Sequence, residues 1–108
     1  MNSVTQVDPA GLKAKMDARE PLCLLDVREP WEVALASIPG SLAMPMNEIP
    51  ARLKELDAAS EIIVMCKSGG RSQRAAQYLL GQGYSRVSNL QGGISAWSRD
   101  IDPDVPEY

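Results

Sequence analysis

Short apolar runs that alternate with amphipathic segments restrict the fold of this chain more than any other feature. Residues 22–27 and 62–65 are such runs, and residues 87–90 form a third, more polar one. Runs this short and this apolar are typical of strands that are covered on both faces of a parallel sheet. Because helical patterns separate the runs, the sequence predicts an α/β domain with a mainly parallel sheet, in which a site lies beyond the carboxyl ends of the strands.

The segments between the predicted strands carry signals for helix starts and ends. Asp8 followed by Pro9 suits the first turn of a helix, because Asp accepts from free amide groups and Pro fits the first helical position. Gly81 and Gly83 end a later helix that begins at Ser72. The predicted helices cover residues 9–17, 30–35, 49–56 and 72–80, with another after Gly92-Gly93, while residues 38–43 form a turn into a small strand and residues 102–108 an extended tail.

Composition narrows the functions open to this chain. The formal net charge of -3 and the pI of about 4.8 argue against a nucleic-acid partner, which requires a concentrated basic surface. The 44% hydrophobic and 23% charged residues are ordinary for a globular protein, so residues 1–108 are expected to form a single domain. The start of the chain does not resemble a leader and no apolar stretch has the length of a membrane span, which predicts a cytoplasmic protein with no membrane partner.

The chain contains no histidine. This excludes histidine-based acid–base catalysis and most zinc sites, so neither a metal nor a cofactor is expected and any nucleophile must be activated by other means. The two cysteines, Cys23 and Cys66, are expected to be free thiols, since cytosolic thiols stay reduced. Cys23 lies within an apolar strand and is expected to be inert core, and Trp31 and Trp97 are also expected to serve packing.

Cys66 lies where a buried strand ends and a glycine-containing loop leads into a helix. The loop has the sequence Cys66-Lys67-Ser68-Gly69-Gly70-Arg71-Ser72. A thiol is a good nucleophile only as thiolate, and at a reference pKa of about 8.5 little of it is ionised at neutral pH. A helix N-terminus, backbone amides turned inward at the glycines, the charge of Arg71 and the hydroxyls of Ser68 and Ser72 would all stabilise the anion.

A structural interpretation of this loop is also open. Cys66 would then end a core strand as a small apolar residue, and the glycine pair would form an ordinary strand-to-helix turn. Ser68 and Ser72 would brace that turn rather than bind a ligand. The flanking Lys67 and Arg71 favour the reactive interpretation, because positive charge stabilises an anionic sulfur and has no purpose around an inert thiol.

Three segments resemble the rhodanese family, whose active-site loop begins with a cysteine at a strand end and often closes with an arginine. They are residues 66–72, the segment Asp26-Val27-Arg28 followed by Glu32, and residues 90–97 with a Gly-Gly pair and Trp97. They occur in the family's order and span nearly the whole chain. The resemblance implies a rhodanese-like three-layer domain with a mainly parallel five-stranded sheet flanked by helices.

The resemblance also implies an activity. The Cys66 thiolate would take the outer sulfur of a small anionic donor such as thiosulfate, hold it as a persulfide and pass it to cyanide, a thiol or a sulfur-carrier protein. The cradle of residues 67–72 would hold that sulfur, and Lys67 would attract the donor. The loop and the tail IDPDVPEY look similar to the rhodanese domains of adenylyltransferases that load sulfur-carrier proteins, so a sulfur carrier or a cysteine desulfurase is an expected partner.

Residues outside the loop have expected supporting roles. Asp26 and Arg28 are expected to order the strand end beside the site, with a structural role favoured over a chemical one. Arg28 and Glu32 are expected to pair with each other or to brace the end of the sheet. Ala36-Ser37 stands where many rhodanese relatives have Gly-His, which alters one wall of the site.

Two alternative functions would use the same Cys66. Cysteine phosphatases and arsenate reductases have a similar anion loop, but five residues separate their cysteine and arginine, whereas four separate Cys66 from Arg71. No general acid is obvious, although Asp26 stays open for that role. The second alternative is a sulfur-relay or binding module that accepts sulfur from a partner protein and has little activity with thiosulfate. The sequence does not separate this module from the enzyme.

Overall fold

A five-stranded sheet forms the centre of the protein, which a computed structural model describes over residues 4–108. The strands lie in the order β1-β5-β4-β2-β3, and all four neighbouring pairs are parallel. Their bounds are Thr5–Val7 for β1, Cys23–Asp26 for β2, Leu42–Ala43 for β3, Ile62–Met65 for β4 and Val87–Leu90 for β5. The predicted α/β class is confirmed, and the sheet is parallel throughout rather than mainly so.

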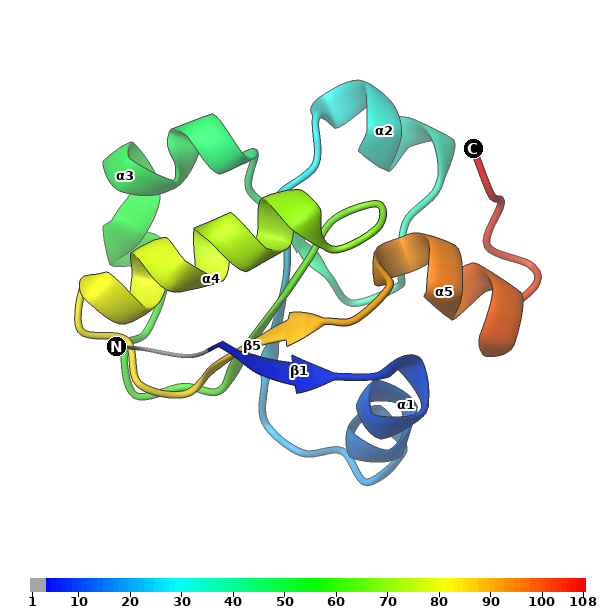
Figure 1. Ribbon diagram of the computed structural model, residues 1–108, viewed down its shortest axis with the longest axis horizontal. Coiled ribbons are helices and arrows are strands. Elements are labelled where there is room, and N and C mark those ends of the chain that lie inside the picture. The colour runs from blue at the N-terminus through cyan, green and yellow to red at the C-terminus, as the bar shows by residue number, and fades with distance from the viewer. Residues whose placement is uncertain (1–3) are drawn as a thin grey trace.

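Helices cover both faces of this sheet, as Figure 1 shows, with α3 and α4 on one side and α1 and α5 on the other. The α-helices are α1 (Pro9–Asp17), α2 (Pro30–Leu35), α3 (Ile49–Arg52), α4 (Gly70–Gly81) and α5 (Gly93–Asp100), with short 3₁₀ turns at Met46–Glu48 and Leu53–Glu55. Asp8 caps α1 as its sequence predicts, since its Oδ1 accepts from the Gly11 amide at 2.7 Å. The result is the three-layer arrangement that the rhodanese resemblance implies.

Alternation along the strands supplies a separate core to each face. On β4, Ile62 and Val64 join the cluster that packs under α3 and α4, while Ile63 and Met65 join the cluster under α1 and α5. All four side chains are fully buried. A strand covered on both faces needs an apolar residue at every position, which is why the run IIVM is continuous rather than alternating. Each such side chain contributes about 1.5–3 kcal/mol through burial.

The strand order brings the carboxyl ends of β2 and β4 side by side. Asp26 is in register with Met65, so the residues that follow these two strands lie at the same edge of the sheet. The loop after β4 contains Cys66, and the segment after β2 leads into α2. Two segments that are about forty residues apart in the chain therefore meet at one site, as is usual in open parallel sheets.

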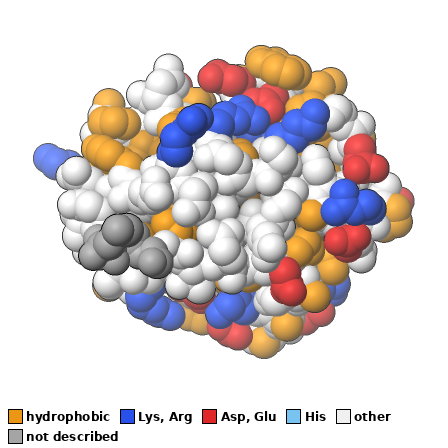
Figure 2. Space-filling view, in the orientation of Figure 1, with side chains coloured by type: hydrophobic (Ala, Val, Ile, Leu, Met, Phe, Trp, Pro, Cys, Tyr) orange, Lys and Arg blue, Asp and Glu red, His pale blue; other side chains and the backbone are white. Residues whose placement is uncertain are grey.

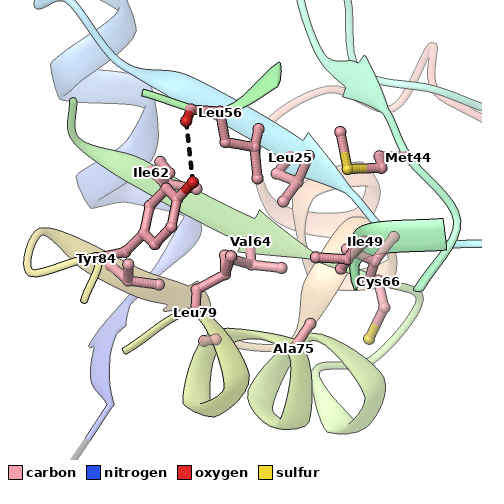
Figure 3. Close-up of a cluster of buried hydrophobic side chains, with 13 residues drawn as sticks. Leu25, Met44, Ile49, Leu56, Ile62, Val64, Cys66, Ala75, Leu79 and Tyr84 are labelled. Atoms are coloured by element: carbon pink, nitrogen blue, oxygen red, sulfur yellow. Dashed lines mark hydrogen bonds between the residues drawn. The ribbon is translucent and has the colours of Figure 1, made fainter. Parts of the chain in front are cut away.

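One helix and the tail differ from their predicted form. The predicted helix 49–56 is α-helical only as far as Arg52, and its continuation is a 3₁₀ turn in which the Leu56 amide donates to the Leu53 carbonyl at 3.1 Å. The Tyr84 hydroxyl lies 2.8 and 3.0 Å from the carbonyls of Leu53 and Leu56, and Figure 3 shows its bond to Leu56. The tail is not simply extended. It turns at Asp102, whose carbonyl accepts from the Val105 amide, and Val105 is buried in the core.

Strand β1 was not predicted from the sequence. It is three residues long, and its first two residues are exposed while Val7 is partly buried. As the edge strand of the sheet it pairs with β5, more than eighty residues away in the chain. Among residues 4–108, no helix is both long and apolar enough to cross a membrane. The first three residues of the predicted 1–108 domain lie outside the described part of the chain.

Candidate active site

Cys66 follows the last residue of β4, and its side chain points toward the first turn of α4 (Figure 3). Gly69 has a φ of 112°, a conformation that glycine adopts without steric cost, and it turns its amide onto the sulfur at a distance of 3.1 Å. The Ser72 hydroxyl lies 3.3 Å from the same Sγ. The sulfur thus sits at the N-terminal end of a twelve-residue helix, where the helix dipole favours negative charge.

The first turn of α5 holds the other side of the loop. The Ile94 amide donates to the Cys66 carbonyl at 2.9 Å, and the Ser95 amide donates to the Lys67 carbonyl at 3.1 Å. A Cβ at Gly93 would lie 2.5 Å or less from these two carbonyl oxygens, so only glycine permits this approach. Gly93, the first residue of α5, therefore has a clear physical purpose, since its missing side chain lets the amides of Ile94 and Ser95 reach the loop carbonyls.

The environment lowers the pKa of the Cys66 thiol. Burial is the largest influence and opposes ionisation, because the residue is only 1% exposed. Hydrogen bonds from the Ser72 hydroxyl and from the backbone amides of Ser72, Gly69 and Ser68 together outweigh burial. The predicted amide cradle is therefore present. Ser68 contributes through its backbone, while its side chain is exposed.

Asn89, a buried residue of β5 that sequence reasoning did not identify, orients Ser72. Its Oδ1 accepts from the Ser72 hydroxyl at 2.5 Å, and its Nδ2 donates to the Gly69 carbonyl at 3.2 Å. Since a hydroxyl has one proton, Asn89 and the Cys66 sulfur compete for the same donor. A polar residue in the middle of a buried strand was the available sequence signal, because such residues need a hydrogen-bond partner.

Arg71 forms a bidentate ion pair with a carboxylate. Its Nη1 and Nη2 lie 2.6 and 2.9 Å from the two carboxylate oxygens of Glu32 on α2. This bidentate pair, helped by the Tyr108 hydroxyl and the Glu29 amide, lowers the pKa of Glu32 to about 2 despite its burial. Arg71 keeps its positive charge, and the Glu32 carboxylate largely compensates that charge. It links the Cys66 loop to α2.

Asp26 and Arg28 form a fully buried ion pair at the end of β2. Arg28 Nη2 and Nε lie 2.7 and 2.9 Å from the two oxygens of Asp26, and both side chains are 0% exposed. Arg28 also donates to the carbonyls of Ala36 and Glu32. The expected structural role of Asp26 agrees with this geometry, and the expected Arg28 contact with Glu32 is made through the Glu32 backbone rather than its carboxylate.

Ala36 and Ser37 form part of the wall beside this ion pair. Ala36 is buried and its carbonyl accepts from Arg28, while Ser37 is exposed. The position where many members of the rhodanese family have Gly-His is therefore occupied here by one packed residue and one solvent-facing residue.

The two tryptophans, which are expected to serve packing, have different environments. Trp97 is 4% exposed, whereas Trp31 is 63% exposed on α2. The helix α2 has only six residues, and its buried face is taken up by Glu32 rather than by an apolar stripe. The Trp31 ring packs edge-on against Tyr108, with ring centroids 6.2 Å apart.

Lys67, the expected donor-binding cation, is half-buried and lies against Tyr108. Its Nζ is 4.8 Å from the centroid of the Tyr108 ring. Figure 2 shows Lys and Arg side chains gathered along the upper part of the face that includes α4, beneath α2 and α3. The exposed Arg74 and the partly exposed Arg71 are on the first turns of α4.

Cys23 lies at the opposite end of the sheet from Cys66. It is in register with Ile62 at the start of β4, and burial raises its pKa. Both cysteines are free thiols. Within residues 4–108, no three acidic or cysteine side chains come together in a way that could hold a metal ion.

Comparison with known proteins agrees with this fold. A family model described as "Rhodanese-like domain" matches residues 8–100. A sulfurtransferase of Allochromatium vinosum is 42% identical over 102 residues, covering 94% of this chain and 95% of that protein. The putative sulfurtransferase YtwF of Bacillus subtilis is 39% identical over 100 residues, covering 93% and 96%. The crystal structure of a rhodanese-related protein from Thermoplasma volcanium matches with a TM-score of 0.81 at 30% identity, covering 90% and 93%.

The chain therefore belongs to the rhodanese family. Its relatives of similar length are named sulfurtransferases, and sulfur transfer is its general activity. A domain of a larger protein is also similar. The maize adenylyltransferase and sulfurtransferase MOCS3-1 is 39% identical over 103 residues, which cover 89% of this chain and 22% of that protein.

Proposed function

We propose that the protein transfers a sulfane sulfur through a persulfide on Cys66. The observation that carries this proposal is the position of Sγ, which lies at the start of α4 within reach of the Gly69 amide and the Ser72 hydroxyl and has a lowered pKa. In the first step the thiolate attacks the outer sulfur of thiosulfate. A bond forms between Sγ and that sulfur, the S–S bond of thiosulfate breaks, and sulfite leaves with the electron pair.

The second step returns the enzyme to its starting state. A thiophile such as cyanide attacks the outer sulfur of the persulfide, a C–S bond forms, and the bond to Sγ breaks to give thiocyanate and the Cys66 thiolate. The negative charge stays near Sγ throughout, so the donors of residues 67–72 stabilise both anionic forms. In this proposal Cys66 is the catalytic residue, the loop binds sulfur and donor, and Asp26 and Arg28 support the loop through α2 and the 36–38 segment.

A sulfur relay between proteins is a second candidate, and the state of Arg71 favours it. Glu32 neutralises the arginine that would otherwise bind a dianionic donor, so the site is less cationic than its sequence indicates. A protein persulfide donor would not need that charge. The relative MOCS3-1 is named both an adenylyltransferase and a sulfurtransferase, and this name supports a sulfur carrier as acceptor. The proposed donor in this relay is a cysteine desulfurase. We place this activity in a single domain of residues 1–108 in the reducing cytoplasm.

One experiment tests the mechanism and compares the donors. The purified protein is incubated with thiosulfate, or with a cysteine desulfurase and cysteine, and Cys66 is examined by peptide mass spectrometry. We expect the mass of one added sulfur on Cys66, loss of that sulfur to cyanide, and no loading of Cys66→Ser, with Cys23→Ser as the matched control that still loads. Full turnover by Cys66→Ser would refute the proposal. Faster loading by the desulfurase than by thiosulfate would favour the relay, and hydrolysis of an aryl phosphate without persulfide would favour a phosphatase.

A further inference from the structure

Tyr108 joins the charged groups around the Cys66 loop, although it lies forty-two positions beyond it. Its hydroxyl donates to Glu32 Oε2 at 2.7 Å and accepts from Arg28 Nη1 at 2.9 Å. The face of its ring lies 4.8 Å from Lys67 Nζ. One side chain therefore contacts the buried cation Arg28 that follows β2, the carboxylate that holds Arg71, and the lysine next to Cys66.

The position of this ring is well fixed. Its hydroxyl bridges two groups that are themselves buried and paired, and its ring packs against Trp31 in a T-shaped arrangement. Val105, three residues earlier, is buried in the core and anchors the segment that carries Tyr108. Burial raises the pKa of Tyr108, so the hydroxyl stays protonated at neutral pH and continues to donate to Glu32.

Lys67 has no carboxylate partner within the described part of the chain, in contrast to Arg71 and Arg28. A lysine side chain has several rotatable bonds and is strongly hydrated, so an unpaired ammonium normally samples many positions. Contact with an aromatic face restricts it while leaving its charge uncompensated, because the ring offers a quadrupole rather than a negative charge. The ammonium can still attract an anion.

We propose that Tyr108 is a positioning residue that seats the Lys67 ammonium beside the Cys66 loop and thereby sets the preference of the site for anionic sulfur donors. The inference rests on the proposed function, since it assigns a donor class to the same site. Tyr108 acts through Lys67 and does not itself touch the reacting sulfur. Because Glu32 compensates the charge of Arg71, the uncompensated Lys67 ammonium is the group that distinguishes an anionic donor from a neutral one.

The test measures the charge preference of the Cys66 thiolate without requiring sulfur transfer. In a Cys23→Ser background, Cys66 is alkylated with iodoacetate, an anion, and with iodoacetamide, which is neutral, and the ratio of the two rates is compared between variants. We expect Tyr108→Leu to lower the ratio of iodoacetate to iodoacetamide about two- to fivefold, as loss of a cation–π contact at a partly exposed site implies. Tyr108→Phe keeps the ring and is expected to keep most of the ratio.

A double substitution determines whether Tyr108 acts through Lys67. Lys67→Ala alone is expected to lower the ratio at least as much as Tyr108→Leu, and adding Tyr108→Leu to Lys67→Ala is expected to change it no further. Lys54→Ala, which removes an exposed cation on the 3₁₀ turn Leu53–Glu55, controls for net charge. If Tyr108→Leu does not fold, Tyr108→Met replaces it, because methionine fills similar space without an aromatic face.

Kinetics with thiosulfate supply a second measurement. Tyr108→Leu is expected to raise KM about two- to fivefold with little change in kcat, because seating of Lys67 affects donor capture rather than the thiolate. An unchanged alkylation ratio, or an equal fall in the Lys67→Ala background, would overturn the inference. Failure of the wild-type protein to form any persulfide on Cys66 would instead count against the proposed function, while the alkylation ratio would still report on Tyr108.

Discussion

Replacing Ser72 by alanine is expected to raise the pKa of Cys66. The Ser72 hydroxyl lies 3.3 Å from Sγ and 2.5 Å from Asn89 Oδ1. With a neutral thiol the single hydroxyl proton bonds to Asn89. With a thiolate it can bond to the negatively charged sulfur, which is a stronger acceptor. Removing the hydroxyl therefore removes a donor that favours the ionised form and leaves the neutral form nearly unaffected.

The size of the effect follows from the strength of such bonds. A hydrogen bond to a charged group contributes about 1.5–3 kcal/mol, and one pKa unit corresponds to about 1.4 kcal/mol, so a shift of about one to two units is the upper range. Because the thiolate must draw the proton away from the short bond to Asn89, the net gain lies at the lower end. We expect a rise of about one unit, which lowers the thiolate fraction about tenfold at any pH below both pKa values.

The pH dependence of iodoacetamide alkylation at Cys66, measured in a Cys23→Ser background, gives this pKa directly. Ser68→Ala is the matched control, because Ser68 acts on the thiol through its backbone amide and its side chain is exposed. The pKa of Cys66 in Ser68→Ala is expected to stay within a few tenths of a unit of the starting protein. An unchanged or lower pKa in Ser72→Ala would show that this hydroxyl serves Asn89 alone and would refute the reasoning.

Three further substitutions test the supports of the site. Glu32→Gln is expected to destabilise the fold by about 2–3 kcal/mol at pH 7. Because the folded pKa of about 2 lies below the unfolded value, this contribution is present above about pH 4.5 and is lost as the pH falls toward 2, so urea titrations of the two proteins should converge in acid. Asp26→Asn leaves the Arg28 charge buried without its partner and should cost about 3–5 kcal/mol in the same assay. Gly93→Ala forces a Cβ onto the loop carbonyls at a φ of 61°, and we expect about 1–3 kcal/mol of destabilisation together with slower persulfide formation, whereas an unchanged loading rate would contradict the close approach described.

Most of the framework could be predicted from local sequence. The run 62–65 coincides with β4, and the helix signals at Pro9, Pro30 and Gly81 gave the bounds of α1, the start of α2 and the end of α4. These elements are fixed by patterns that lie within a few residues of one another. The tight loop after β4 could be predicted for the same reason, because a cysteine, a glycine pair and a helix start are contiguous there.

The rest depends on contacts between distant parts of the chain. Strand β1 has only three residues, too few to show a periodicity, and its partner is β5. Glu32 was identified as a motif residue, but its bond to Arg71 crosses from α2 to α4. The return of the tail to α2 was likewise not predictable. The exposure of Trp31 and its contact with Tyr108 were not predictable either, because this contact joins α2 to the far end of the chain.

The parallel sheet also decides what can happen to a sulfur atom once it is bound. Cys23 is in register with the first residue of β4 and Cys66 follows the last, so about 13 Å of strand separates the levels of the two thiols. A disulfide needs Cα atoms within about 7 Å, and the sequence contains no third cysteine. In the proposed mechanism Cys23 would therefore be too far away to discharge a persulfide on Cys66. The sulfur would instead pass to a second molecule, and a thiol from another molecule would restore an oxidised Cys66.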